Sequence, residues 1–98
     1  MVRLGFFIRL ETKPGRGAEL EARLERALPK IEQEAGTIAW FAVRLGPTSS
    51  AVFDAFPNEE ARQVHLEAGR KGLESVADLL VEAPIVVQTD IIAAKLPK

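Results

Sequence analysis

The stretch "TIAWFAVRLGPTSSAVFDAFPNEEARQVH", residues 37–65, contains two predicted strands and the start of a helix. Its first part, residues 37–45, is rich in β-branched and aromatic residues, and the turn residues "GPTSS" separate it from a second apolar run at 51–57. Two such runs joined by a short turn are typical of a β-hairpin. The length of the turn leaves the register open by one residue, so the sequence does not show which side chains face Trp40.

Two further strands are predicted at the ends of the chain. Residues 2–11 alternate between apolar and other side chains, which is the period of a strand. Residues 84–95 form a second long apolar run that begins at a proline, where a missing N–H is tolerated.

Helices are predicted between these strands. Apolar residues recur at helical spacing from 18 to 35, and this face continues across Pro29, so we expect Pro29 to lie inside the helix. Asn58 is a good N-cap for the next helix. Gly69 and Gly72 interrupt that run, and we therefore predict two consecutive helices there.

The resulting order, βαββαβ, predicts an α+β protein with a ferredoxin-like fold, in which a four-stranded antiparallel sheet carries its helices on one face. Residues 1–98 are expected to form a single domain. The last three strands are apolar on both faces, whereas a sheet exposed on one side should alternate between apolar and polar residues. A second copy of the chain is the simplest cover, so we predict a homodimer that packs through the sheet face.

The composition narrows the class of protein. The chain is 47% hydrophobic and 28% charged, with a net charge of -1, so it has no basic surface for nucleic acid. It lacks cysteine, and its one histidine argues against a metal site built by the protein. Arg3 and Arg9 interrupt the first apolar run, which leaves no signal peptide or membrane span, and a cytoplasmic location is expected. Four polar residues inside apolar strands are expected to pair with each other or with a partner chain: Arg44, Asp54, Gln88 and Asp90.

His65 is the candidate functional residue. Ala61, Val64, His65 and Ala68 stand at i, i+3, i+4 and i+7, which places the ring on the apolar stripe of its helix. It is either a core histidine that keeps one hydrogen bond, or a base in a pocket where Ala61 and Ala68 leave space. Trp40 is either a packing residue of the core or interface, or a wall on which a flat ligand stacks.

Four motifs resemble, in their order and spacing, the antibiotic biosynthesis monooxygenase family of dimeric α+β barrels. They are "KPG" at 13–15, "EAGTIAW" at 34–40, "FDAFPNEEARQVHLEAG" at 53–69 and "DIIAAK" at 90–95. His65 matches the histidine that members of this family often carry on this helix. Many members have Trp at the end of the third strand, where this chain has Phe56.

The resemblance implies a homodimer with a pocket in each subunit between sheet and helices. We predict that this pocket is lined by Trp40, Phe56, Ala61 and Ala68. It also implies the oxygenation of anthrones or quinols without metal or flavin that some members carry out. We therefore predict a monooxygenase that needs no cofactor, acts on a small phenolic, quinol or anthrone-like substrate, and uses His65 as the catalytic base. The alternative is a dimeric binding protein, without catalysis, for a small aromatic or lipid-like ligand. Neither interpretation requires nucleic acid or a membrane.

Overall fold

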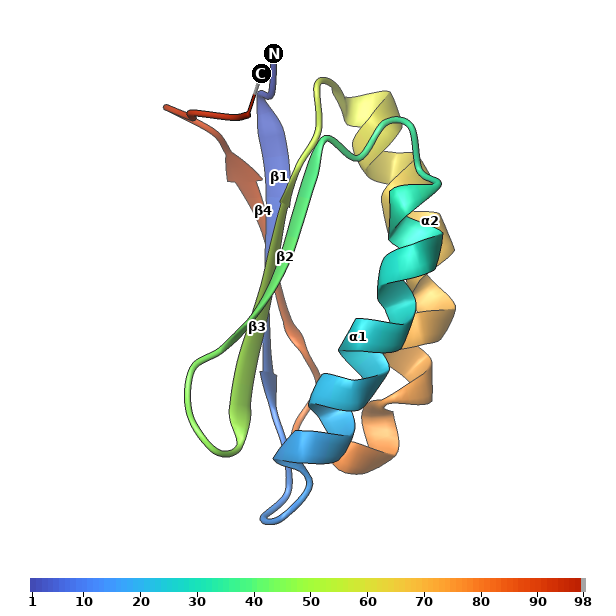
Figure 1. Ribbon diagram of the computed structural model, residues 1–98, viewed down its shortest axis with the longest axis vertical. Helices are drawn as coiled ribbons and strands as arrows, with labels where there is room; N and C mark the ends of the chain where they lie inside the picture. Colours follow the sequence, from blue (N-terminus) through green and yellow to red (C-terminus); the bar gives the residue numbers. More distant parts are fainter. Residues whose placement is uncertain (98) are drawn as a thin grey trace.

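The computed structural model describes residues 1–97, and the predicted order of strands and helices is confirmed (Figure 1). The elements are β1 (Leu4–Glu11), α1 (Gly17–Glu32), β2 (Ala39–Arg44), β3 (Ser49–Ala55), α2 (Glu59–Ser75), the short 3₁₀ helix η1 (Ala77–Leu79) and β4 (Ile85–Asp90). The four strands form one antiparallel sheet in the order β2-β3-β1-β4. Both long helices cover the same face, so the fold is ferredoxin-like.

The helix predictions are confirmed in part. Pro29 lies inside α1, as the apolar spacing predicts. The side chain of Asn58 caps α2 by accepting a hydrogen bond from the Ala61 N–H at 2.9 Å. The predicted break at Gly69 and Gly72 is wrong, because α2 runs through both glycines to Ser75 and only η1 follows it. Each glycine costs a helix about 1 kcal/mol, which the packing of the same helix on the sheet can offset.

The hydrophobic core lies between the helices and the sheet. Its fully buried side chains come from β1, α1, the residue after β3, and η1: Leu10, Leu20, Phe56 and Leu79. No helix within residues 1–97 has the length and apolar character needed to cross a bilayer.

The opposite face of the sheet exposes an apolar row that crosses all four strands. The register aligns Phe41 with Phe53, Phe53 with Phe7, and Phe7 with Val87. All four side chains are more than a third exposed, and Phe41 is 51% exposed. The pattern on which the dimer prediction rests is therefore present in the folded chain.

The hairpin register, which the sequence leaves open, places Trp40 directly opposite Asp54. Both residues therefore lie on the helix-covered side of the sheet. This register brings an acidic residue and the single tryptophan into the space between sheet and helices.

Candidate functional site

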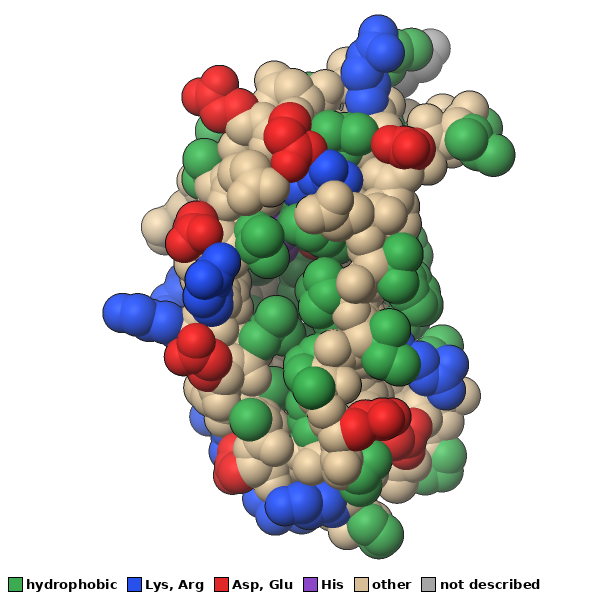
Figure 2. Space-filling model, turned by 180° about the vertical axis from the view of Figure 1, so that it is seen from behind, with side chains coloured by type: hydrophobic (Ala, Val, Ile, Leu, Met, Phe, Trp, Pro, Cys, Tyr) green, Lys and Arg blue, Asp and Glu red, His purple; other side chains and the backbone are tan. Residues whose placement is uncertain are grey.

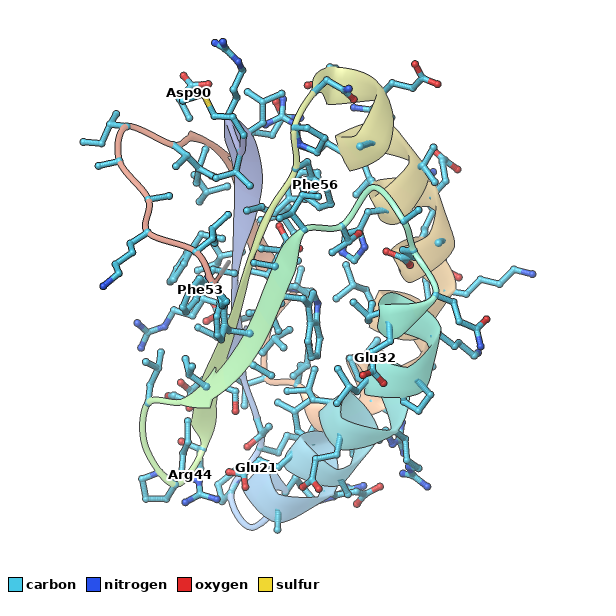
Figure 3. The ribbon with its side chains drawn as sticks, turned by 45° about the horizontal axis from the view of Figure 1, so that its top comes forward. Glu21, Glu32, Arg44, Phe53, Phe56 and Asp90 are labelled. Atoms are coloured by element: carbon cyan, nitrogen blue, oxygen red, sulfur yellow. The ribbon has the colours of Figure 1, made fainter. Side chains whose placement is uncertain are left out.

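His65 lies near the middle of α2, and the residue is only 7% exposed. Its ring packs against the ring of Phe56, with 5.2 Å between the two centroids. Phe56 follows β3 and points toward the helices, whereas Phe53 points away from them (Figure 3). His65 is therefore held inside the layer between helix and sheet.

Both ring nitrogens of His65 face carboxylate oxygens. Nδ1 lies 2.5 Å from Oε1 of Glu34, and Nε2 lies 3.1 Å from Oδ2 of Asp54. A neutral imidazole has a single N–H, so one of its nitrogen lone pairs would face a carboxylate. The contacts therefore favour the imidazolium, in which both nitrogens donate. We refer to Glu34, His65 and Asp54 together as the His65 array.

The pKa of His65 is raised above its ordinary value of 6.5. Burial is the largest single influence and acts in the opposite direction, because desolvation disfavours the charged ring. The hydrogen bonds and the negative charges of Asp54 and Glu34 together outweigh burial. The two carboxylates thus keep the ring protonated over a wider pH range than a free histidine.

Asp54 is the fixed end of the array. Its side chain is fully buried in β3, and Oδ1 accepts a hydrogen bond from the Phe6 N–H at 2.9 Å. Among the described residues, Oδ2 has no partner other than the ring of His65. A buried carboxylate is costly unless it is paired, so His65 is the group that neutralises Asp54.

Glu34 is the more accessible end of the array. It lies in the loop between α1 and β2, and its side chain is 16% exposed. Oε1 also accepts a hydrogen bond from Thr37 Oγ1 at 2.8 Å. The loop approaches α2 so closely that a Cβ on Gly36 would lie 2.8 Å from the Cβ of Ala61. The two small residues therefore allow the loop to bring Glu34 to His65.

A cavity of about 170 Å³ lies beside the array, between both helices and the sheet. Its polar side chains come from His65, Arg23 and Ser75, and Trp40 forms part of its wall. The rest of the lining is mainly apolar and includes Phe6, Leu10, Leu24, Ile31, Val52 and Leu73. Seen from the side opposite to Figure 1, the molecule is hollowed, with hydrophobic side chains gathered in the hollow and charged ones around it (Figure 2).

The predicted site residues occupy different places. Trp40 and His65 line the cavity, and Phe56 lies beneath the ring of His65. Ala61 packs against the loop at Gly36. Ala68 is exposed and does not line the cavity.

The apolar stripe of α2 also differs from the one expected. Val64 is 60% exposed, whereas Leu66, Gly69 and Leu73 line the cavity. The buried face of α2 is therefore rotated about the helix axis relative to the expected apolar stripe. His65 lies where the expected and the observed faces overlap.

The sequence missed the pairing of the polar strand residues. The carboxylate of Asp54 forms its ion pair with His65 and not with Arg44. Arg44 at the end of β2 pairs with Glu21 of α1, at 2.6 Å for both of its hydrogen bonds (Figure 3). A charge in the middle of an apolar strand was the signal for Asp54, but nothing in the sequence singled out Glu34.

The array is suited to holding a proton rather than a metal ion. Within residues 1–97, no three His, Cys, Asp or Glu side chains are gathered so that they could hold a metal. In the array the imidazole lies between the two carboxylates, so the three groups do not face a common point. The arrangement can orient the ring, fix its protonation and keep it beside a mainly apolar space.

Comparisons with known proteins support the fold. Neither the protein-family models nor the curated proteins give a match to the chain. A crystal structure of the NE2512 protein of unknown function from Nitrosomonas europaea is 43% identical, with a TM-score of 0.93, and the match covers 100% of this chain and 97% of that one.

Two more distant structures carry a family name. Both are named "Putative antibiotic biosynthesis monooxygenase". The one from Nitrosomonas europaea is 14% identical, with a TM-score of 0.81 over 92% of this chain and 90% of that one. The one from Caulobacter crescentus CB15 is 16% identical, with a TM-score of 0.80 over 94% of this chain and 92% of that one. The chain therefore belongs to the same family as the NE2512 protein, and its fold is that of the antibiotic biosynthesis monooxygenases.

Proposed function

We propose that the chain, as one domain over residues 1–98, is a cofactor-independent monooxygenase that acts on a small phenol or quinol. The observation that carries the proposal is the buried His65 array at the wall of a mainly apolar cavity. Perturbed titratable groups beside an apolar cavity are common at functional sites. The names of the structures that share this fold point to the same class of reaction.

The size of the cavity favours a substrate with a single ring. Pockets for drug-sized ligands usually measure about 300–1,000 Å³, and the space beside His65 is about 170 Å³. A phenol or a one-ring quinol suits this volume better than a three-ring anthrone does.

The reaction is balanced without an external reductant. A phenol loses the hydrogen of its hydroxyl group and one ring hydrogen, and it gains one oxygen atom to become a quinone. The second oxygen atom of O₂ leaves as water with those two hydrogens. The His65 array accepts the hydroxyl proton, the phenolate passes an electron to O₂, and the two radicals combine on the ring carbon before water is lost. The apolar lining limits access of competing water to the anion.

Oxygen uptake tests this proposal. We expect uptake by the parent protein with at least one member of a panel of one-ring phenols and quinols. His65→Gln should lower the rate about 100-fold to 10,000-fold, the usual contribution of a positioned acid or base. Gln63→Ala, at an exposed position on the same helix, is the matched control and should leave the rate unchanged. Absence of uptake across the panel would overturn the proposal.

A binding protein for a small aromatic or lipid-like ligand is the second candidate. It is favoured by one observation: both nitrogens of His65 already have carboxylate partners, which leaves no free lone pair in the resting state. Mass spectrometry under native conditions should then detect a retained ligand in protein that shows no oxygen uptake.

We also propose that the protein is a homodimer. The apolar row of Phe7, Phe41, Phe53 and Val87 lies on the face that the helices leave open. Exposed apolar patches of this kind are typical of interaction surfaces. The row crosses the whole sheet, so a second copy of the same sheet offers a complementary cover.

A further inference from the structure

We propose that Glu34 and Asp54 are positioning residues that act through His65, and that Glu34 carries the substrate proton from the cavity to solvent. This inference rests on the proposed oxygenase function. It assigns separate roles to the two carboxylates, since one is fixed inside the sheet and the other lies near the surface.

Asp54 fixes the orientation of the ring. Its other oxygen is held by the Phe6 N–H in β1, so the carboxylate cannot rotate without the loss of a buried hydrogen bond. With Oδ2 turned to Nε2, the Nε2–H is retained and the ring is held in one orientation at the cavity wall. A carboxylate that orients a histidine in this way is a recurrent part of acid–base sites.

Glu34 passes the proton from His65 to solvent. His65 lines the cavity, while Glu34 does not line it and keeps 16% of its side chain exposed. The array thus connects the cavity to the surface through the contact between Nδ1 and Oε1. Nδ1 has a single in-plane position, and Glu34 faces it. When His65 gives its Nδ1 proton to Glu34 and the protonated Glu34 turns away toward solvent, Nδ1 becomes free to take the substrate proton. The ring ends as it began, and Glu34 returns the proton to water.

Among residues 1–97, the charged partners of the ring are Glu34 and Asp54 alone. Glu34 faces it from the loop after α1, and Asp54 faces it from β3. Arg62, one turn earlier on α2, points instead to Glu59 and to the carbonyls of Gly5 and Thr89. The protonation of His65 is therefore governed by the two carboxylates.

Nuclear magnetic resonance tests the array without a substrate, because the chain has a single histidine. In the ¹⁵N-labelled parent, both ring nitrogens should show imidazolium shifts at pH 7. Glu34→Gln should lower the pKa of His65 by about one unit or more, since an opposite charge at this range usually shifts a pKa by 1–3 units. Asp54→Asn should do the same where it folds. Glu32→Gln removes an equal charge two residues away at an exposed position and should change nothing.

The kinetic arm uses Glu34→Gln and Glu34→Asp. The first should lower oxygen uptake at least tenfold and shift its pH profile with the pKa of His65, and the second should restore part of the rate. An unchanged titration of His65 in Glu34→Gln would overturn the array, even if the parent consumes oxygen. Conversely, a shifted titration in a protein that consumes no oxygen would support the coupling and contradict the oxygenase function on which the relay rests.

Discussion

Phe41 of β2 and Phe53 of β3 stack on the face of the sheet opposite to the helices, with ring centroids 5.1 Å apart and planes inclined by 26°. Their register pairing places them side by side, yet each is more than 40% exposed. Two stacked aromatic rings at the surface form a compact apolar anchor, and the proposed dimer would pack on it.

The first prediction concerns this anchor. We expect the parent to sediment as a dimer at micromolar concentration, with a total buried area on the order of 2,000 Å². Phe41→Glu should convert it to a monomer, because the substitution places a charge in an apolar interface. Val64→Glu, at an exposed position on the outer side of α2, is the control and should remain a dimer. A monomeric parent at this concentration would contradict the proposed dimer.

The second prediction concerns the stability of the array. His65→Ala should lower the free energy of unfolding by about 3–5 kcal/mol, since it leaves the fully buried carboxylate of Asp54 without a charged partner. Val64→Ala, on the exposed side of the same helix, should change it by about 0.5 kcal/mol or less. Chemical denaturation of the three proteins measures both effects. If His65→Ala were as stable as the parent, the pairing of His65 with Asp54 would make no contribution to the free energy of unfolding.

The third prediction concerns pH. The folded protein holds the ring proton more tightly than the unfolded chain, because the pKa of His65 is raised in the folded state. The resulting stabilisation is complete below the unfolded pKa of about 6.5 and is lost as pH rises through the raised pKa. The difference in unfolding free energy between the parent and Glu34→Gln should therefore be larger at about pH 5.5 than at about pH 9.

Surface carboxylates act at lower pH and can be separated from this effect. Hydrogen bonds from Ser49 and Thr48 lower the pKa of Glu11, and a hydrogen bond from Arg16 lowers the pKa of Glu19. Their contribution is present above the unfolded pKa of about 4.5 and is lost on acidification. A parent whose advantage over Glu34→Gln grew toward pH 9 would contradict the sign expected for His65.

The fourth prediction concerns the two glycines in α2. No atom lies within 4 Å of a Cβ built on Gly69 or Gly72, so alanine fits at both positions. Each substitution should stabilise the fold by about 0.5–1 kcal/mol, because alanine loses less backbone entropy in a helix. Both glycines line the cavity, so the stabilised double variant should bind or turn over ligand less well. Denaturant titration measures the stability of the double variant, and oxygen uptake on the same sample measures its turnover. A double variant that is less stable than the parent would contradict the predicted stabilisation.

The fold was predictable from the sequence because its signals are local and repeated. Alternation in residues 2–11 and helical spacing across Pro29 each depend on many residues, so one unusual residue does not change the assignment. The break expected at Gly69 and Gly72 failed for the opposite reason. Two glycines weaken a helix locally, but the packing of α2 on the sheet decides its length.

The site was harder to predict because it depends on register and loop path. His65 was found from its position on a helix, but its partners lie 11 and 31 residues away along the chain. Asp54 meets it only because the hairpin pairs Trp40 with Asp54, and a slip of one residue would turn that carboxylate to the other face. Glu34 reaches it through a loop whose approach depends on the small size of Gly36 and Ala61. No periodic pattern encodes either contact.

Trp40 gives the cavity an optical signal of its own. It is the only tryptophan in a chain without tyrosine, and its side chain forms part of the cavity wall. Emission from the unlabelled protein therefore comes from one indole next to the ligand space. A ligand that excludes water there should shift the emission to shorter wavelength, and a quinone formed there should quench it. The filling of the cavity, and the product of the proposed oxygenation, can thus be followed by fluorescence in the unmodified chain.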